Sequence, residues 1–540
     1  MTREEIKGVI IQATREYQMQ ELLPDFDASE IVVERPADEK NGDYYTNVAL
    51  KIAPLAKKSP LKIAQILSKR LKEKLLFAEI KIAPPGFINF YLLKEYLCEQ
   101  VEEILEDKEN YGWLNLGQGE KIQIEFISAN PTGPLTLGNG RGGFFGDVLA
   151  NVMAAAKYEV KREYLINDAG YQIEVLGHSI LKDEKAQYRG EYIEALAEKF
   201  ENEGNKNPKE IGQQAARYIM ETMIKPTVEQ RMKIKFDGWT SESELRQAGL
   251  MDKVLEYLKQ KGLSYEHEGA LWFKSSQFGD DKNRVLVTSN KGERDSEATY
   301  ILPDAAYHYK KFAIDKFDKV INIWGADHHG YVARLKAAKK ALGLPGKLEI
   351  IIMQMVRLFE GGKEVKMSKR AGTYVTLDEL LDEIPLDVAR FFFLMYSPDT
   401  HMDFNLDLAR EHSQKNPVYY VQYAYARISS ILKKSGVQDI GAGNLSDLTK
   451  LLAAQAEFSL IRQLMRMPEI IQDTAGDYQA QRLPQYALDL VRAFHKFYEE
   501  CRVISENENL TQARLGLVEA TRIVLKNTLD LMGISAPEKM

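Results

Sequence analysis

The sequence contains little cysteine. Only two cysteines, Cys98 and Cys501, occur in 540 residues, and they stand far apart in the chain. This number excludes a disulfide framework and a zinc cluster built from the cysteines of this chain. We therefore expect a protein of a reducing compartment that holds no structural metal.

Long apolar runs are also missing. No segment approaches the roughly 20 consecutive apolar residues that a membrane-spanning helix needs, and 28% of all residues are charged. The first residues, MTREEIKGVIIQATREYQ, mix acids and bases and lack the apolar centre of a signal peptide or the acid-poor composition of a transit peptide. These absences predict a cytoplasmic protein that does not cross a membrane.

An excess of positive charge is absent as well. The formal net charge is −7, whereas a protein that coats nucleic acid without specificity needs a basic surface that neutralises phosphates. The charge therefore excludes that class of protein.

The length of the chain requires several domains, because 540 residues exceed what one hydrophobic core organises and suggest about three or four units. Residues 1–110 alternate helical segments with short strand-like runs at 80–82 and 87–92, which is typical of a small α/β domain. A polar, glycine-bearing stretch then precedes a second domain, which we place at residues 118–385.

The second domain alternates strands with helices. Its strand-like runs are residues 122–128, 163–167, 320–325 and 348–356. Helical stretches such as residues 332–342 lie between them, and this alternation predicts an α/β fold with a doubly wound, Rossmann-like parallel sheet. The helical, charged segment 173–258 is interpreted as an insertion into this domain.

The last domain, residues 400–540, is predicted to be an all-helical bundle. From Pro417 onward the apolar residues recur at helical spacing, and Pro417 suits the first position of a helix. A later helix is expected to end at Leu531 with Gly533 as its cap.

A glycine-rich segment, ANPTGPLTLGNGRGG (residues 129–143), connects the predicted strand 122–128 to a helical stretch at 144–156. Nucleotides bind where the carboxyl end of a strand leads into a helix. Gly138 lets a flat adenine approach the backbone, Gly133 and Gly140 serve the turn, and the free N–H groups of the helix start favour a triphosphate. A turn without any ligand is the alternative for this segment taken alone.

A basic segment, KMSKR (residues 366–370), follows the strand-like run 348–356 and is flanked by Gly361, Gly362 and Gly372. Such glycines indicate a loop that can move. Reaction at a phosphate builds negative charge on its oxygens, and flexible ammonium groups stabilise that charge. A solvated basic loop is the alternative, but the pairing with the upstream glycine-rich segment favours phosphate chemistry.

The two segments together resemble the HIGH and KMSKS signatures of class I aminoacyl-tRNA synthetases. Six further stretches are similar to bacterial-type arginyl-tRNA synthetases: EFISANPTGP, YLINDAGYQI, FGDDKNRVLV, WGADHHGYVARLKAA, MSKRAGTYVTLDEL and NPVYYVQYAYARISSIL. The similarity extends from GDYYTNVAL (residues 42–50) to Met540, so the chain is identified as a member of this family.

The resemblance implies a reaction and its partners. ATP, entering as its Mg²⁺ complex, would activate L-arginine to arginyl-adenylate, and the arginyl group would pass to the terminal ribose of its tRNA. Members of the family are understood to need bound tRNA even for the first step. Residues 1–110 would bind the tRNA elbow and residues 400–540 the anticodon, and the protein would act as a monomer.

The same resemblance implies the catalytic residues, which are Thr136, Asn139, Lys366 and Lys369. The residues expected at ATP are Pro131, Gly133, Leu137, Gly138, Met367 and Ser368. One departure concerns the first signature, where the family usually has His at its first position and His or Asn at its last. Thr136 and Asn139 cannot act as an imidazolium, so they must donate neutral hydrogen bonds to phosphate or ribose oxygens. More of the phosphate charge then falls to the two lysines.

An arginine guanidinium offers five donors and no acceptor, so its pocket must present carboxylates. By similarity, the residues expected at arginine are Asn130, Glu242, Tyr300, Asp304 and His328. Tyr300 and Asp304 are spaced for one helical face, and a surface acid is the alternative for Glu242. His328 and His329 lack partners at zinc-like spacing, so we predict no zinc site there.

For tRNA, the resemblance implies Phe87 and Asn89 at the elbow, and Tyr420, Tyr423 and Met540 in the anticodon-binding bundle. Aromatic faces stack on bases that are splayed from a loop. Burial in the helical core is the alternative for the two tyrosines.

Two other functions are compatible with parts of this sequence. A class I synthetase for another amino acid, or a small nucleotidyltransferase, would share the nucleotide site, but the set of Glu242, Tyr300 and Asp304 argues against it. A noncatalytic paralogue that binds tRNA or protein partners would explain the departure at Thr136 and Asn139, but the intact KMSKR argues against that.

Overall fold

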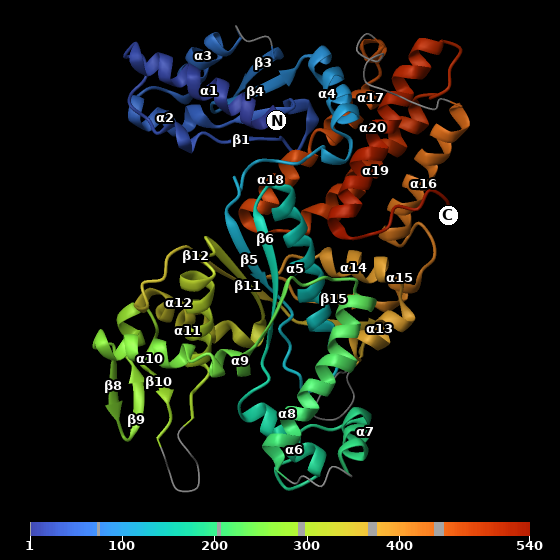
Figure 1. Cartoon of the computed structure of the whole chain (residues 1–540). Helices are drawn as coiled ribbons and strands as arrows, with labels where there is room; N and C mark the ends of the chain where they lie inside the picture. Colours follow the sequence, from blue (N-terminus) through green and yellow to red (C-terminus); the bar gives the residue numbers. More distant parts are fainter. Residues whose placement is uncertain (1, 73–75, 202–206, 290–296, 366–374, 437–447) are drawn as a thin grey trace.

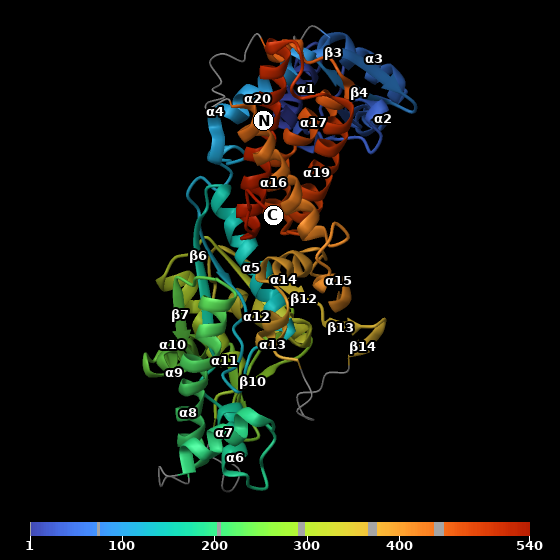
Figure 2. The same ribbon diagram turned by 90° about the vertical axis from the view of Figure 1, so that its right-hand side faces the viewer.

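The computed structural model describes residues 2–72, 76–201, 207–289, 297–365, 375–436 and 448–540. They form an elongated molecule, with the N-terminal α/β unit and the C-terminal helices side by side at one end (Figures 1 and 2). The central parallel sheet lies in the middle, and helices α6 (Tyr171–Leu181), α7 (Glu191–Phe200) and α8 (Pro208–Ile219) lie at the opposite end. No helix in the described part of the chain has the length and apolar character that a bilayer span requires.

The N-terminal unit is a four-stranded antiparallel sheet with helices, in the order β1-β2-β4-β3. Its elements are α1 (Thr2–Met19), β1 (Val33–Glu34), β2 (Tyr44–Thr46), α2 (Val48–Ala56), α3 (Pro60–Leu71), β3 (Phe77–Ala83), β4 (Phe87–Leu92) and α4 (Lys94–Asp107). The strands predicted at residues 80–82 and 87–92 are confirmed as β3 and β4.

The central sheet confirms the predicted doubly wound fold, because all of its neighbouring strands run parallel in the order β12-β11-β5-β6-β7. The strands are β5 (Lys121–Glu125), β6 (Glu159–Ile166), β7 (Gly238–Ser241), β11 (Lys319–Gly325) and β12 (Lys347–Met353), and helices α5 (Leu137–Ala155), α11 (Ile301–Tyr309) and α12 (Val332–Ala341) are among the connections. The chain winds outward from β5 in one direction and later in the other. The order therefore reverses between β5 and β11, which is where such sheets bind ligands.

The predicted helical insertion 173–258 is wrong in part, because it contains β7, which pairs with β6 in the central sheet. Three boundaries also differ from the sequence-based expectation. Strand β5 ends at Glu125, because Ile127 and Ser128 adopt positive φ values of 65° and 37° that a strand cannot contain. The apolar run 348–356 is divided between β12 and the next strand, β13 (Val356–Glu360). Helix α5 begins at Leu137 rather than at residue 144, so Gly138 and Gly140 lie inside its first turn and not in the loop before it.

The remaining elements surround this sheet. Helix α8 continues into two π-helical turns, η5 (Met220–Ile224) and η6 (Thr227–Arg231), and a small antiparallel sheet contains β8 (Ser264–His267), β9 (Ala270–Phe273) and β10 (Arg284–Val287). A third small sheet joins β13 to β14 (Lys363–Val365) and β15 (Met402–Asn405), next to α13 (Leu377–Glu383), α14 (Leu386–Leu394) and α15 (Leu406–Arg410).

The C-terminal part is helical, as predicted. It contains α16 (Pro417–Ser435), α17 (Gln455–Leu464), α18 (Met467–Asp477), α19 (Arg482–Glu500) and α20 (Glu508–Met532). Pro417 is the first residue of α16, and Gly533 caps α20 at a φ of 65°, a left-handed conformation that favours glycine. Helices α17 and α18 pack beside the N-terminal unit (Figure 1).

Candidate active site

Thr136 and Asn139, two of the residues predicted to be catalytic, cap the N-terminal end of α5. The Thr136 hydroxyl donates to Asn139 Oδ1 at 2.8 Å, and the Thr136 backbone N–H donates to the same oxygen at 2.9 Å. In return, the Asn139 backbone N–H donates to Thr136 Oγ1 at 3.5 Å. The two residues therefore form a reciprocal helix cap. Their mutual bonds leave the Nδ2 group of Asn139 as the donor suited to a ligand oxygen.

The glycines of this segment differ in what requires them. A Cβ on Gly140 would come within 2.7 Å of Leu377 Cδ1, so packing explains that glycine. A Cβ on Gly138 would meet only Thr136 Oγ1, at an ordinary 3.7 Å, and Gly138 is exposed. Packing does not require glycine at 138, which fits close approach of a ligand. Pro131 and Leu137 are buried, and Gly133 lies against the ring of Tyr192.

The described residues that follow the second signature segment lie beside the first segment. Lys366, Met367, Ser368 and Lys369 lie outside the described residues. The chain enters this segment from β14, and it emerges at Thr376, which forms an isolated β-bridge with Thr136. The Leu377 N–H also donates to the Leu135 carbonyl at 2.9 Å. Thr376 and Leu377 therefore lie next to the start of α5.

Glu242 opens helix α9 (Glu242–Gln247) and is only 7% exposed, which excludes the alternative of a surface acid. Arg246 Nε and Nη2 both bond to its Oε1, at 3.0 and 2.5 Å. Burial raises the pKa of Glu242, and the Arg246 guanidinium partly opposes that rise. The second carboxylate oxygen is left for another donor.

Asp304 lies in the first turn of α11, where burial raises its pKa to about 7. The Tyr331 hydroxyl and the Lys311 ammonium group lower the pKa of Asp304, whereas Glu125 and Glu242 raise it. Tyr300, at the N-terminal end of the same helix, is 63% exposed. Its pKa is raised by burial and by the charge of Glu242. Glu242, Tyr300 and Asp304 thus share one electrostatic environment, in which a cationic ligand would stabilise both carboxylates.

Asn130 and His328 follow neighbouring strands of the sheet. Asn130 comes after β5, donates to Gln172 Oε1, and accepts a bond from Asn167 Nδ2 at 2.9 Å. His328 is exposed in the short helix η9 (Ala326–Tyr331) after β11, with its Nε2 3.5 Å from an Asp327 carboxylate oxygen. Because β5 and β11 are parallel neighbours, both residues lie at the same edge of the sheet.

Sequence reasoning missed two residues of this site, although both stand in stretches that resemble the family. Tyr331 faces Asp304 and lowers its pKa. Asp168 accepts bonds from the Ser241 and Ser243 hydroxyls at 2.7 and 2.8 Å and from the Ser243 backbone N–H at 2.9 Å. It thereby fixes the start of the helix that carries Glu242. Nothing in the spacing of either residue distinguishes it from a surface side chain.

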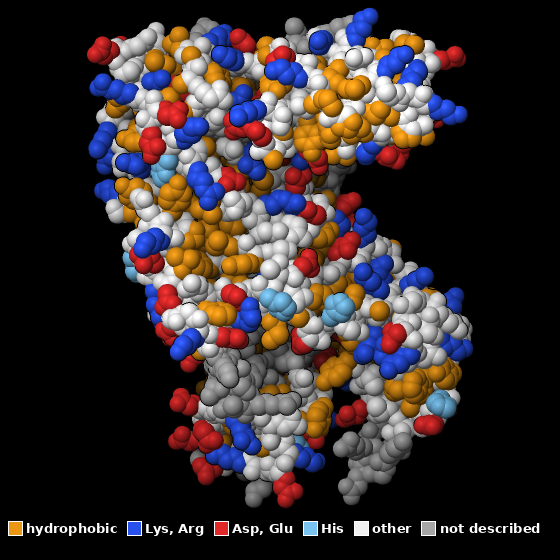
Figure 3. Space-filling model, turned by 180° about the vertical axis from the view of Figure 1, so that it is seen from behind, with side chains coloured by type: hydrophobic (Ala, Val, Ile, Leu, Met, Phe, Trp, Pro, Cys, Tyr) orange, Lys and Arg blue, Asp and Glu red, His pale blue; other side chains and the backbone are white. Residues whose placement is uncertain are grey.

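The residues expected at tRNA differ in accessibility. Tyr423 is 39% and Met540 60% exposed, whereas Asn89 is only 7% exposed. Phe87 is half-buried against Tyr45, at 5.8 Å between ring centroids. Tyr420 is half-buried, and its hydroxyl lies 3.0 Å from His495 Nδ1. On the face drawn in Figure 3, Lys and Arg side chains alternate with Asp and Glu.

Comparison with known proteins adds sequence evidence to this geometry. Three family models match: the arginyl tRNA synthetase N terminal domain at residues 3–92, the tRNA synthetases class I (R) catalytic domain at 100–391, and the DALR anticodon binding domain at 421–540. The chain is 42% identical to the arginine–tRNA ligase of Caldanaerobacter subterraneus subsp. tengcongensis, covering 100% of this chain and 99% of that one. It is 44% identical to the arginine–tRNA ligase of Bacillus subtilis, covering 100% and 98%.

A solved structure has the same fold. The arginyl-tRNA synthetase of Thermus thermophilus superposes with a TM-score of 0.78, over 100% of both chains, at 24% sequence identity. At that identity the likeness concerns the fold alone.

Proposed function

The chain belongs to the arginyl-tRNA synthetase family of class I aminoacyl-tRNA synthetases, and from this premise we propose how its residues carry out the reaction. The reaction uses ATP to activate L-arginine and then joins the arginyl group to tRNA. The observation that carries this proposal is a pair of acids, of which Glu242 is buried and Asp304 half-buried. Their raised pKa values favour a guanidinium beside the nucleotide-binding edge of the sheet.

In the first step, the arginine carboxylate attacks the α-phosphate of ATP and pyrophosphate leaves. Asp304 and Glu242 bind the guanidinium, Tyr300 lines the pocket, and Asn130 and His328 contact the amino and carboxylate end. Holding the two reactants in one geometry removes much of the entropic barrier. The mutual orientation of Asn130, Asn167 and Gln172 supports this assignment, because the amide is already fixed in the turn after β5.

At the nucleotide, we assign adenine to Gly138 and the segment from Pro131 to Leu137, including Gly133. The Nδ2 group of Asn139 donates to an ATP oxygen, while Thr136 holds the cap that orients Asn139. Lys366 and Lys369, with Met367 and Ser368, contact the phosphates, where charge accumulates during the reaction. ATP enters as its Mg²⁺ complex, and the ion neutralises the leaving pyrophosphate.

We assign tRNA binding to both ends of the chain. In this division residues 1–110 bind the elbow through Phe87 and Asn89, and residues 400–540 bind the anticodon. Residues 118–385 carry the chemistry, including the segment 173–258, of which β7 belongs to the central sheet. The exposed ring of Tyr423 supports stacking on a base, and Tyr420 and Met540 lie in the same bundle. We further propose a cytoplasmic monomer; two buried cysteines that form no disulfide support the reducing compartment.

The test is an aminoacylation assay with purified protein, ATP, tRNA and arginine, in which ATP consumption is followed with and without tRNA. We expect charging with arginine and ATP consumption that depends on tRNA. Lys369→Ala should lower the rate by about a thousandfold, because one ammonium group at contact distance from phosphate is worth about 4 kcal/mol. The matched control is Lys363→Ala, because Lys363 is an exposed lysine of β14, which precedes the segment of Lys369 in the sequence. Absence of charging with any amino acid would overturn the enzyme assignment.

A further inference from the structure

Four buried polar side chains form a hydrogen-bond chain behind the proposed arginine pocket. Its members come from three elements of the sheet domain and from the π-helical turn η8 (Lys310–Ile314), which directly follows α11. They are Glu125 of β5, Lys311 of η8, Asn322 of β11 and His308 of α11, each at most 3% exposed. The wider turn of a π-helix changes the direction in which its side chains point, and such turns often occur at functional sites.

The hydrogen bonds along this chain have one possible direction. Lys311 Nζ can only donate, and it bonds to Glu125 Oε2 at 2.5 Å and to Asn322 Oδ1 at 3.3 Å. Asn322 therefore directs its Nδ2 group to His308 Nε2, at 2.9 Å. That ring nitrogen must accept, so the proton of the neutral imidazole is on Nδ1, which donates to the Asp304 carbonyl at 2.8 Å. Burial and the Lys311 charge hold the pKa of His308 well below its usual value, which agrees with a neutral ring.

The two ends of this hydrogen-bond chain, His308 and Glu125, reach two sides of the proposed arginine pocket. At one end, His308 binds the peptide group that follows Asp304. At the other end, Glu125 Oε1 accepts a bond from the Ser128 hydroxyl at 3.3 Å. Ser128 Oγ in turn accepts from the Leu165 N–H at 3.0 Å, in the left-handed turn that leads to Asn130. One connected set of bonds thus links the helix that carries Asp304 to the turn that carries Asn130.

Such a chain is costly, because a buried lysine and glutamate lose their hydration and hydrophobic side chains of similar size would stabilise the fold as well. Their charges also act on the site, since Lys311 lowers and Glu125 raises the pKa of Asp304. These side chains stabilise the fold no better than apolar ones would, yet they end at two sides of a ligand pocket. This suggests that they orient the residues that bind the ligand.

We propose that His308, Asn322, Lys311 and Glu125 are positioning residues for arginine, which fix Asp304 relative to the turn of Asn130 through one buried hydrogen-bond chain. The inference rests on the proposed function, because it assigns Asp304 and Asn130 to arginine. It adds residues that do not touch the substrate and act only through those that do.

The test separates arginine binding from general stability. Asn322→Leu removes the central link and leaves the Lys311–Glu125 pair intact. We expect the KM for arginine to rise about tenfold, the equivalent of one net hydrogen bond, while the KM for ATP changes little. The urea midpoint should fall in this variant and in its control alike, because each loses a buried hydrogen bond. The matched control is Gln123→Leu on the adjacent strand. Gln123 is also a buried amide, at 1% exposure, but it bonds to Glu163 and not to a member of the hydrogen-bond chain. This control should leave the KM for arginine unchanged.

The outcomes distinguish this inference from the proposed function. If the unaltered protein does not charge tRNA with arginine, the proposed function fails. If it does, but Asn322→Leu leaves the KM for arginine unchanged, or raises the KM values for arginine and ATP equally, the positioning role is overturned. Should Asn322→Leu not fold, His308→Gln decides by the same comparison. It keeps an acceptor for Asn322 and loses the bond to the Asp304 carbonyl, so an unchanged KM for arginine would again overturn the inference.

Discussion

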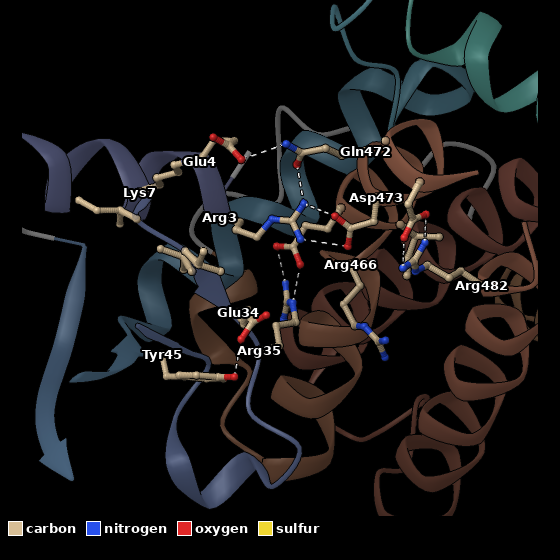
Figure 4. A pocket seen from close by; sticks show the side chains of 17 residues that line it. Arg3, Glu4, Lys7, Glu34, Arg35, Tyr45, Arg466, Gln472, Asp473 and Arg482 are labelled. Carbon is tan, nitrogen blue, oxygen red and sulfur yellow. Dashed lines mark hydrogen bonds and ion pairs between the residues drawn. The ribbon is translucent and has the colours of Figure 1, made fainter. Parts of the chain in front are cut away.

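Two groups of charged side chains connect distant parts of this chain, and they differ in their access to water. One group joins the N-terminal unit to α18, where Arg3 pairs with Asp473 at 2.6 Å and Arg35 with Glu469 at 2.8 Å. These residues line a cavity of about 750 Å³ (Figure 4). The other group is the buried chain around Lys311 and Glu125, whose side chains are 0% and 4% exposed.

Similar ion pairs differ in how much stability is lost when one partner is removed. An exposed pair contributes about 0–1 kcal/mol to stability and weakens in salt, because water and ions compete with it. Breaking a buried pair costs about 3–5 kcal/mol, because the remaining charge stays without hydration. The Arg3–Asp473 pair, whose carboxylate is 38% exposed, can therefore lose a partner at small cost. The carboxylates of the Lys311–Glu125 and Arg35–Glu469 pairs are only 4% and 6% exposed, so these pairs depend on both partners.

The largest effect is expected from Lys311→Met, which leaves the Glu125 carboxylate buried without its cation. We predict a loss of about 3–5 kcal/mol in the free energy of unfolding, measured by urea denaturation and followed by tryptophan fluorescence. Trp239, Trp272 and Trp324 all lie in strands of the catalytic region.

The double variant Lys311→Met with Glu125→Leu is the matched control, because it removes both charges. It should recover most of the lost stability. A double variant as unstable as Lys311→Met would contradict the view that an unpaired buried charge causes the loss.

A smaller effect is expected from pH, and it should arise at Asp304 in the proposed arginine pocket rather than at the junction of the N-terminal unit with α18. Asp304 has a pKa of about 7, set by burial and by Tyr331, Glu125, Glu242 and Lys311. The guanidinium binds the carboxylate form, so arginine binding is complete above this pKa and is lost as the pH falls through it. We predict that kcat/KM for arginine falls by up to about tenfold per pH unit below pH 7.

The control for this pH dependence is Asp304→Asn. It should bind arginine weakly at all pH values and remove the part of the profile that Asp304 causes. A profile of the same shape in Asp304→Asn would show that another group is responsible.

Much of the fold could be predicted because its signals are local. The inner strands β5 and β11 of the central sheet are largely buried, and β12 at its edge forms an apolar run. Pro417 and Gly533 mark helix ends through their backbone preferences. The end of β5 could not be predicted, because positive φ values at Ile127 and Ser128 have no signal in those residue types.

The candidate site was predicted in part. Similarity to a family identified Asp304 and Glu242, but it did not indicate that Thr136 and Asn139 bond to each other as a helix cap. The pair of Lys311 and Glu125 is 186 positions apart in the chain. A lysine in a charged sequence is expected at the surface, so only the three-dimensional structure reveals that this one is buried.

The smallest effect is expected at the junction, from Arg3→Ala. Arg3 bonds to Asp473 and to Gln472, and the Asp473 side chain is 38% exposed. We predict a loss of about 0–1 kcal/mol at low salt that shrinks further near 1 M salt, where charges are screened within about 3 Å. Calorimetric unfolding at the two salt concentrations measures this loss of unfolding free energy. The comparison is Lys311→Met, whose loss salt should leave nearly unchanged, because the Lys311–Glu125 pair is buried away from water and ions. If Arg3→Ala cost as much as Lys311→Met, or if its cost did not depend on salt, exposure to water would not be what separates the two groups.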